Sequence, residues 1–383
     1  MKRLLIAPDS FKGCMTAMEA AQAIEEGWKS VLGTSWSYYK IPMADGGEGT
    51  TQSLHDALGG TRITVEVTNP LGYPIQAQYS LVNHGQTAVI ETAAASGIDL
   101  LTRETRDPLR TTTYGTGELV RDALNQGVSH IILGIGGSAT NDGGAGFLQA
   151  LGVRLKDKQG QEIPFGGAAL QQLVNIDITH IDPRIANVTF DVACDVTNPL
   201  LGDNGATAVY GRQKGVTSET APILEAALTR YHDVIQQQLG KNVAHIAGAG
   251  AAGGLGTALL ACLSANLRSG IDIVLEATNF SHYALNCDLV ITGEGCIDGQ
   301  TVFGKTPLGV ARAAKKYHKP VIAVAGTIGK GYEALYDCGI DAVYSLSKGP
   351  SSLEEALAEG QEALKRWAAN MARFYQLLQG GGI

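Results

Sequence analysis

Residues 288–326 read DLVITGEGCIDGQTVFGKTPLGVARAAKKYHKPVIAVAG. Two short apolar runs, DLVITG at 288–293 and PVIAVAG at 320–326, flank a segment at 307–317 with the composition of a helix. A strand, a helix and a second apolar strand form the unit from which parallel sheets are built. This stretch therefore predicts a parallel sheet whose two faces are covered by helices.

The same alternation continues toward both ends of the chain. The carboxyl-terminal segments are a short helix, a strand and a long helix, at 332–338, 341–347 and 352–378. The amino-terminal segments are two strands that alternate with two helices, at 3–7, 17–32, 37–44 and up to Leu58. We therefore expect both chain ends to form one doubly wound, Rossmann-like domain with a parallel sheet.

The middle of the chain has a different pattern. Residues 61–82, TRITVEVTNPLGYPIQAQYSLV, alternate apolar and polar residues around a turn, which is typical of an antiparallel hairpin. Further strands of mixed character are expected at 87–93, 130–136, 152–157 and 188–195. The predicted fold class is α/β with two domains: residues 1–60 and 256–383 form the discontinuous Rossmann-like domain, and residues 61–255 form an inserted mixed α/β domain.

Composition excludes several classes of protein. With 44% hydrophobic and 17% charged residues, the chain of 383 residues is not a disordered one. The net charge is −8 and no basic run occurs, so a nucleic-acid partner is not expected. The six cysteines are scattered without a C-x-x-C pair, which indicates reduced thiols in the cytoplasm.

A stretch without Asp, Glu, Lys or Arg extends from Asn242 to Leu267. It consists mainly of Ala and Gly and contains His245 and Asn266, so a buried helix after a glycine-rich loop is favoured over a membrane span. No membrane partner is therefore expected, and no oligomeric state is predicted.

Two acidic loops follow the amino-terminal strands. In APDSFKG, at 7–13, Asp9 is a candidate base or metal ligand and Lys12 a candidate anion contact; the alternative is an Asp that caps the next helix. In MADGGEGT, at 43–50, Asp45 and Glu48 would repel a bare phosphate but suit a bound Mg²⁺. Acidic residues that merely cap a helix are again the alternative.

A longer polar loop occurs in HIILGIGGSATNDGGAGFLQALG, residues 130–152. Gly134, Gly136 and Ala139 match the dinucleotide pattern G-x-G-x-x-G/A, and Asp157 follows about twenty residues on, as an NAD(P)-dependent oxidoreductase would require. The run of Ser, Thr, Asn and Asp inside the loop favours a phosphate and metal site instead. Glycines that only permit tight packing are a third interpretation.

Three further segments complete the set of motifs. Asp195 in VACDVTNPLLG follows an apolar strand, where it is either a functional carboxylate or a turn former. GAGAAG at Gly248–Gly253 matches G-x-G-x-x-G, but chance matches are common in such a glycine-rich sequence. Gly299–Thr306 matches the P-loop pattern, yet the strand is expected to end near Thr292, so we expect only a phosphate contact from Lys305.

These segments resemble the bacterial glycerate kinases of class I. The matching stretches occur in the family's order from residue 4 to beyond residue 340: APDSFKG, ADGGEGT, RDPLRTTTYGTGEL, GIGGSATNDGGAGFLQALG, ACDVTNPLLGDNGA, GAGAAGGLG and ITGEG. The resemblance implies a two-domain α/β enzyme that phosphorylates D-glycerate with ATP and Mg²⁺ and releases ADP. Among the two phosphoglycerates, it favours 2-phosphoglycerate as the product.

Two positions depart from the family's pattern. Cys296 stands where relatives commonly have Arg in G-E-G-R-[IL]-D, and Arg212 stands where they commonly have Pro in G-P-Q-K-G. If the usual arginine binds an anion, its loss weakens binding unless Arg212 reaches the same site. A non-catalytic relative that binds a metabolite therefore remains an alternative, beside the oxidoreductase.

Phosphoryl transfer requires backbone donors, carboxylates for a metal, a cation near the moving phosphate and a base for the hydroxyl. Asp195 is the first candidate for the base and Asp9 the second. The predicted catalytic residues are Asp195, Asp9, Lys12 and Lys305. The predicted cofactor-binding residues are Gly136, Gly137, Ser138, Asn141, Gly293 and Asp298, and the predicted metal ligands are Asp45, Glu48 and Glu294.

Overall fold

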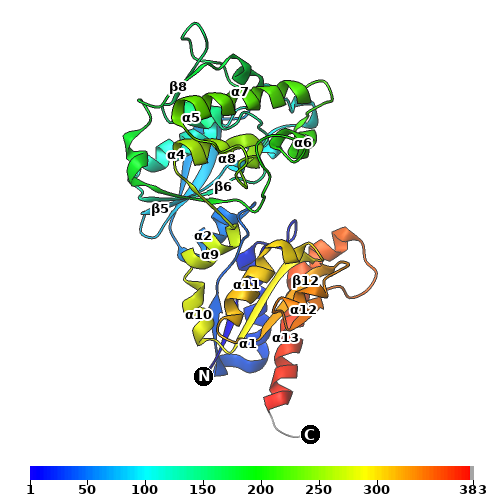
Figure 1. Ribbon diagram of the computed structural model, residues 1–383. Coiled ribbons are helices and arrows are strands. Elements are labelled where there is room, and N and C mark those ends of the chain that lie inside the picture. Colours follow the sequence, from blue (N-terminus) through cyan, green and yellow to red (C-terminus); the bar gives the residue numbers. More distant parts are fainter. Residues whose placement is uncertain (380–383) are drawn as a thin grey trace. The chain divides into compact units, whose positions relative to one another are not determined.

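The computed structural model describes residues 1–379, apart from the side chain of Phe303. The chain forms two compact units, which we call unit 1 and unit 2 (Figure 1). Unit 1 comprises Met1–Asp45, Gln52–Gly59 and the described chain from Ile271 onward, and unit 2 comprises Gly46–Thr51 and Gly60–Gly270.

The sheet of unit 1 has five strands, and every neighbouring pair is parallel. Its order is β13 (Ala342–Ser345), β12 (Val321–Ile328), β11 (Leu289–Ile297), β1 (Lys2–Ile6) and β2 (Trp36–Lys40). Counted within the unit, this is the doubly wound order 2-1-3-4-5, whose direction reverses between β1 and β11. Ligands bind at the carboxyl ends of strands on either side of such a reversal, so β1 and β11 mark the expected site.

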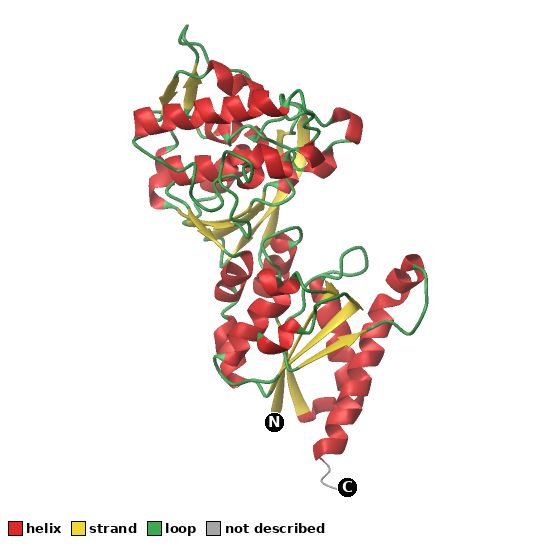
Figure 2. Cartoon of the chain, turned by 45° about the vertical axis from the view of Figure 1, so that its right-hand side comes forward, coloured by secondary structure: helices red, strands yellow, loops and turns green. Residues whose placement is uncertain are grey.

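Helices cover both faces of this sheet (Figure 2). Leu4 and Ile6 pack on one face with Trp28 of α1 (Ala17–Leu32) and Leu364 of α13 (Leu353–Gln379). Side chains alternate along a strand, so Leu5 points to the other face, where α10 (Phe280–Asn286) and α11 (Thr306–Lys315) contact β1 and β11. The predicted doubly wound domain is thereby confirmed.

Unit 2 contains a mixed six-stranded sheet in the order β10-β9-β6-β5-β4-β3. Its strands are β3 (Thr61–Thr68), β4 (Pro74–Val82), β5 (Thr87–Glu91), β6 (His130–Gly134), β9 (Thr189–Ala193) and β10 (Asn266–Arg268). β3 and β4 form the predicted antiparallel hairpin, whereas β5, β6, β9 and β10 are parallel. This mixed sheet confirms the second α/β architecture that the sequence predicts.

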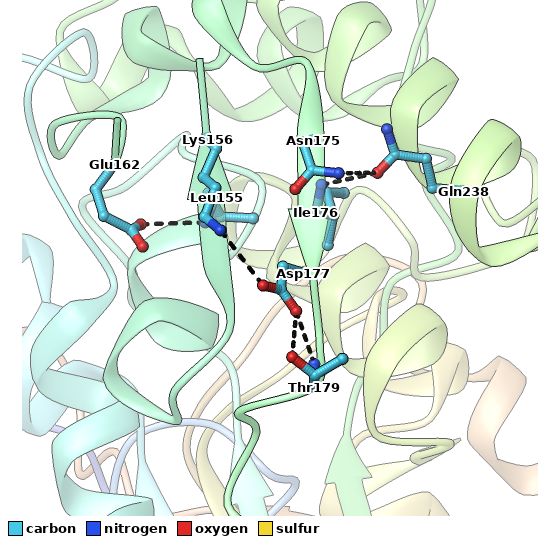
Figure 3. A network of polar contacts seen from close by, with 8 residues as sticks. All are labelled: Leu155, Lys156, Glu162, Asn175, Ile176, Asp177, Thr179 and Gln238. Atoms are coloured by element: carbon cyan, nitrogen blue, oxygen red, sulfur yellow. Dashed lines mark hydrogen bonds and ion pairs between the residues drawn. The ribbon is translucent and has the colours of Figure 1, made fainter. Parts of the chain in front are cut away.

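A small second sheet in unit 2 joins β7 (Arg154–Lys156) and β8 (Asn175–Asp177) (Figure 3). An ion pair joins the two strands, with Lys156 Nζ 3.4 Å from Asp177 Oδ2. Gln238 Oε1 on α7 (Ala221–Leu239) accepts a hydrogen bond of 2.8 Å from the backbone N–H of Ile176. The small sheet is thus bonded to α7, the longest helix of unit 2.

The remaining elements are short. The other helices are α2 (Thr50–Leu58), α3 (Ala93–Ser96), α4 (Tyr114–Asn125), α5 (Ala145–Ala150), α6 (Ala206–Tyr210), α8 (Ala251–Cys262), α9 (Gly270–Ala277) and α12 (Ala334–Asp337). Turns of 3₁₀ helix occur at Gly33–Ser35, Ile98–Leu100, Arg103–Thr105, Gly167–Gln172, Pro183–Asn187, Arg212–Lys214 (η6) and Thr301–Phe303 (η7). None of the helices within residues 1–379 is both long and apolar enough to cross a membrane.

Two predictions differ from the observed elements. The strand expected at 288–293 continues to Ile297, because Glu294, Cys296 and Ile297 extend the ladder with β12. Cys296 therefore lies within β11 and not beyond its end. The compact units also differ from the predicted domain limits, since Gly46–Thr51 and residues 256–270 pack with unit 2; the limits themselves stay a prediction.

Candidate functional site

Two carboxylates and their partners lie at the reversal of strand order in unit 1. Asp9 follows β1, and its Oδ1 accepts a 2.6 Å hydrogen bond from the backbone N–H of Ser10. The hydroxyl of Thr306, at the start of α11, donates to Asp9 Oδ2. Burial raises the pKa of Asp9 to about 6; the bond from Thr306 opposes this rise and the charge of Asp45 adds to it.

Glu294 on β11 is the second carboxylate, and only 9% of its surface is exposed. Its Oε1 accepts a 2.8 Å hydrogen bond from the hydroxyl of Thr301, and Lys305 Nζ lies 3.8 Å from its Oε2. Burial raises the pKa of Glu294 to about 7, Thr301 and Lys305 lower it, and the charges of Asp9 and Asp45 raise it further. Two carboxyl groups in one unit thus titrate near neutral pH.

This carboxylate set suits a divalent cation. The charge of Asp45 opposes the ionisation of Asp9 and Glu294, and the charge of Asp9 further opposes that of Glu294; a bound cation would offset this repulsion. Within residues 1–379, no three or more His, Cys, Asp or Glu side chains are grouped as a complete metal site. Mg²⁺ commonly takes only one or two protein carboxylates and completes its shell with phosphate and water, so the donors present fit it.

The P-loop-like segment Gly299–Thr306 does not have the P-loop path. β11 ends at Ile297, η7 intervenes at Thr301–Phe303, and α11 begins at Thr306. A P-loop runs directly from its strand into its helix around the phosphates. What remains of the motif is Lys305 at the N-cap of a ten-residue helix, a position that favours a bound anion.

Two residues predicted to bind a cofactor have local structural roles. A side chain at Gly293 would place its Cβ 2.2 Å from the carbonyl oxygen of Val324, so this glycine permits the close pairing of β11 and β12. Asp298 Oδ1 accepts a 2.8 Å hydrogen bond from the backbone N–H of Gln300, which shapes the turn after β11. Their predicted contact with a cofactor stays a prediction.

The polar loop after β6 in unit 2 is organised around a lysine. Gly136 and Gly137 are exposed, whereas Ser138 is only 6% exposed. Lys214 of η6 is 2% exposed, and its Nζ donates to Ser138 Oγ at 2.9 Å and to the carbonyl oxygen of Thr140 at 2.7 Å. Burial lowers the pKa of Lys214 to about 7. Three of the predicted residues thereby lie on a loop braced by a buried cation.

Neighbouring residues hold the rest of this loop. Asn141 is fully buried, and its Nδ2 donates to Thr207 Oγ1 at 3.0 Å. Asp142 accepts bonds of 2.8 Å from the backbone N–H and 2.9 Å from the hydroxyl of Thr113, and one of 3.1 Å from Gly144 N. Asp142 therefore ties the loop to the start of α4.

Sequence reasoning missed Lys214. The segment G-R-Q-K-G, residues 211–215, drew attention only for Arg212, which is exposed on η6. A lysine two residues later looks like an ordinary surface residue, and only its burial distinguishes it. The one available signal was the family-like segment in which it stands.

The dinucleotide interpretation of the same loop is wrong. β6 ends at Gly134 and α5 begins only at Ala145, so the tight strand-to-helix turn of that fingerprint is absent from this segment. Asp157 shapes the β7 turn, where its Oδ1 accepts bonds of 2.9 Å from the backbone N–H groups of Gln159 and Gln161. It is thus engaged as a turn former.

The glycines of GAGAAG serve packing. A Cβ at Gly250 would lie 2.1 Å from the carbonyl oxygen of Pro199. A Cβ at Gly253 would lie 2.0 Å from that of Thr140, and Gly253 has a φ of +70°. These glycines therefore allow the backbone of α8 to pack directly against the polar loop.

The remaining predicted residues are divided between the units. Asp195 is exposed after β9, and its Oδ1 accepts a 3.1 Å bond from Gly270 N in unit 2. Glu48 is exposed and belongs to unit 2, whereas Asp45 and Glu294 belong to unit 1. Lys12 is exposed in the turn after β1. The predicted roles of these residues stay predictions.

Comparison with known proteins gives one consistent result. The family model described as the glycerate kinase family matches residues 4–376. A glycerate kinase of Halalkalibacterium halodurans is 54% identical over 97% of this chain and 98% of its own length. The glycerate 2-kinase of Escherichia coli K12 is 48% identical over 97% of each chain.

A solved structure agrees with these relatives. The crystal structure of a candidate glycerate kinase 2 from Salmonella typhimurium LT2 is 48% identical and covers 99% of each chain, with a TM-score of 0.92. The sequence and the fold thus agree over nearly the whole chain. The chain belongs to the glycerate kinase family.

Proposed function

We propose that the protein phosphorylates D-glycerate with ATP, releases ADP and forms 2-phosphoglycerate. The observation that carries this proposal is the family match over residues 4–376. The 48% identity to a protein named glycerate 2-kinase supports the 2-phosphate as the product. The same full-length similarity speaks against an oxidoreductase and against a degraded, non-catalytic relative.

The chemical step needs a base for the glycerate hydroxyl. As the base takes the hydroxyl proton, the oxygen forms a bond to the γ-phosphorus, the bond from that phosphorus to the β–γ bridging oxygen breaks, and ADP leaves. We assign the base to Asp9, because a pKa of about 6 lets it stay ionised at neutral pH and still accept a proton. Asp195, which the sequence favoured, becomes the second candidate.

The phosphate groups need positive charge. Lys305 is proposed to contact the transferred phosphate, since it lies at the N-terminus of α11 and 3.8 Å from Glu294. Asp45 and Glu294 are proposed to hold Mg²⁺, which would offset the negative charge of the phosphates when bound. In unit 2, Gly136, Gly137, Ser138 and Asn141 are proposed to bind an anionic group of a substrate.

The proposed setting is the cytoplasm. All six cysteines are free thiols: Cys14, Cys194, Cys262, Cys287, Cys296 and Cys338. Free thiols are the usual form in a reducing compartment.

Product identification tests the proposed function. Purified protein is incubated with ATP, MgCl₂ and D-glycerate, and phosphorus NMR distinguishes 2-phosphoglycerate from 3-phosphoglycerate while a coupled assay follows ADP. L-glycerate and glycolate serve as control acceptors, and Lys305→Met serves as a variant with an impaired site. The proposal predicts ADP release that depends on D-glycerate, with the 2-phosphate as product. ADP release without acceptor, or formation of the 3-phosphate, would contradict it.

A further inference from the structure

Lys214 contacts Ser138, one of the proposed anion-binding residues, but has no part in the roles proposed so far. Two protons of the Lys214 ammonium group are engaged, one with Ser138 Oγ and one with the carbonyl oxygen of Thr140. A lysine with 2% exposure is costly to bury unless its charge acts on a partner. Among the described residues, Asp142 is the one carboxylate whose charge acts on this ammonium group.

Asp142 is itself fully engaged by other donors. Its oxygens accept bonds from the backbone and hydroxyl of Thr113 and from the backbone N–H groups of Gly144 and Gly146. It therefore offsets the charge of Lys214 through space without forming an ion pair with it. Burial lowers the pKa of Lys214 to about 7, and an anion bound at the polar loop would favour the charged form of the lysine.

Ser138 lies next to the exposed part of the polar loop. Because its Oγ accepts from Lys214, its own hydroxyl proton must point to another acceptor. Among residues 1–379, the structure gives no acceptor for that proton, and the neighbouring Gly136 and Gly137 are exposed. The hydroxyl is thus an oriented donor beside exposed backbone.

The loop is also stiff enough to hold this orientation. Gly253 packs so closely on Thr140 that a Cβ at Gly253 would lie 2.0 Å from the carbonyl oxygen of Thr140. The carbonyl oxygen of Gly253 accepts a 3.0 Å hydrogen bond from Gly143 N. Lys214 holds the same Thr140 carbonyl group from η6. Groups held on both sides give a preorganised donor and reduce the cost of ligand binding.

We infer that Lys214 is a positioning residue that orients the Ser138 hydroxyl as a donor to an anionic oxygen of a substrate, either the carboxylate of the hydroxy acid or a phosphate of the nucleotide. The inference rests on the proposed function for the identity of the two substrates. It assigns Ser138 the direct contact and Lys214 an effect through Ser138. The two sources of the anion are distinguished by which substrate's binding is weakened.

The test uses Ser138→Ala, Lys214→Met and the double variant, with Lys158→Met as the control for loss of an exposed lysine in unit 2. KM for D-glycerate, KM for ATP and kcat are measured, and calorimetric titration gives the affinity for D-glycerate and for a non-hydrolysable ATP analogue. Ser138→Ala is expected to weaken one of the two ligands about tenfold or more, the size of a lost bond to a charged group. Its kcat is expected to fall far less, and Lys158→Met to match the wild type.

Coupling between the two residues decides the positioning role. Lys214→Met should weaken the same ligand as Ser138→Ala, and the double variant should bind that ligand no more weakly than Ser138→Ala alone. Additive effects, or unchanged affinity for both ligands in folded Ser138→Ala, would overturn the inference. If Lys214→Met fails to fold, Lys214→Arg takes its place in the same comparison, because arginine keeps the charge but changes the contact with Ser138 Oγ. If the wild type lacks kinase activity but Ser138→Ala weakens a ligand in the titration, the proposed function fails and the binding role stands.

Discussion

Asp9 and Asp195 differ in their surroundings more than in their sequence signals. Both follow an apolar strand, which is why the sequence offered both as bases. Asp9 is in a buried environment with neighbouring carboxylates, whereas Asp195 is exposed and bonded to Gly270 N. Burial and like charge are the factors that move a carboxyl pKa toward neutrality, and both act on Asp9.

We predict opposite effects on activity and stability for Asp9→Asn. Without a base, kcat should fall by about a hundredfold or more, while the affinity for ATP changes little. In the wild type, kcat/KM should rise as the pH passes about 6, where Asp9 loses its proton. Steady-state kinetics across pH 5–8 measure both effects.

The stability effect follows from the raised pKa. In the folded protein Asp9 keeps its proton up to about pH 6, whereas its ordinary pKa is 3.8. The stability contributed by the neutral form is full below 3.8 and is lost as the pH rises through about 6. At pH 8 the ionised Asp9 destabilises the fold, so Asp9→Asn should raise Tm at pH 8. At pH 4 the wild-type carboxyl group is neutral in the folded protein, and the variant should have no such advantage in Tm. Normal turnover in this variant, with a large loss in Asp195→Asn, would move the base to Asp195.

At the scale of elements, the boundaries of α1 were predictable because its signals are local. Thr16 accepts a bond from Glu19 N and Glu19 reaches back to the Thr16 backbone, so the residue pattern T-x-x-E marks the helix start. The end of β11 was not predictable in this way. Glu294 and Cys296 look like loop residues, and only pairing with Ala325 and Thr327 of β12 makes them part of the strand.

The crossing of α1 and α13 predicts a further effect. A Cβ at Gly27 would lie 2.1 Å from the carbonyl oxygen of Lys365 and 2.8 Å from Ala368 Cβ. Gly27→Ala should gain about 1 kcal/mol of helix propensity. It should lose more than this, for a net destabilisation of about 1–3 kcal/mol, because the helices must move apart.

Urea unfolding gives the measurement for Gly27→Ala, as a lower midpoint with an unchanged slope. Lys29→Ala, on the exposed part of the same helix, is the matched control and should stay within about 0.5 kcal/mol of the wild type. A stabilised Gly27→Ala would show that the two helices are not held at this distance in solution.

At the scale of the whole molecule, the two units have separate hydrophobic cores. One contains Phe147 and Tyr231 of unit 2, and the other contains Trp28 and Leu364 of unit 1. Each unit has the size of an ordinary domain. We propose that the units are domains in the thermodynamic sense, as the predicted discontinuous layout requires.

Core variants test this proposal. Phe147 is fully buried, and Phe147→Ala should cost about 3–5 kcal/mol in unit 2. Scanning calorimetry should then show one transition shifted to lower temperature while the other stays in place. Leu364→Ala is the reciprocal variant and should shift the other transition. A single two-state transition that both variants lower equally would contradict the proposal.

The parallel sheet of unit 1, the hairpin at 61–82, the family and most of the loops with polar or charged side chains could be predicted from the sequence. These follow from local periodicity and from motifs of adjacent residues. Only the folded structure brings the charges of Asp9 and Asp45 to act on Glu294, although Asp9 and Glu294 are separated by 285 residues in the chain. It also decided that Lys214 is buried against Ser138. Burial and through-space charge depend on which distant segments pack together, and no local pattern of residues records that.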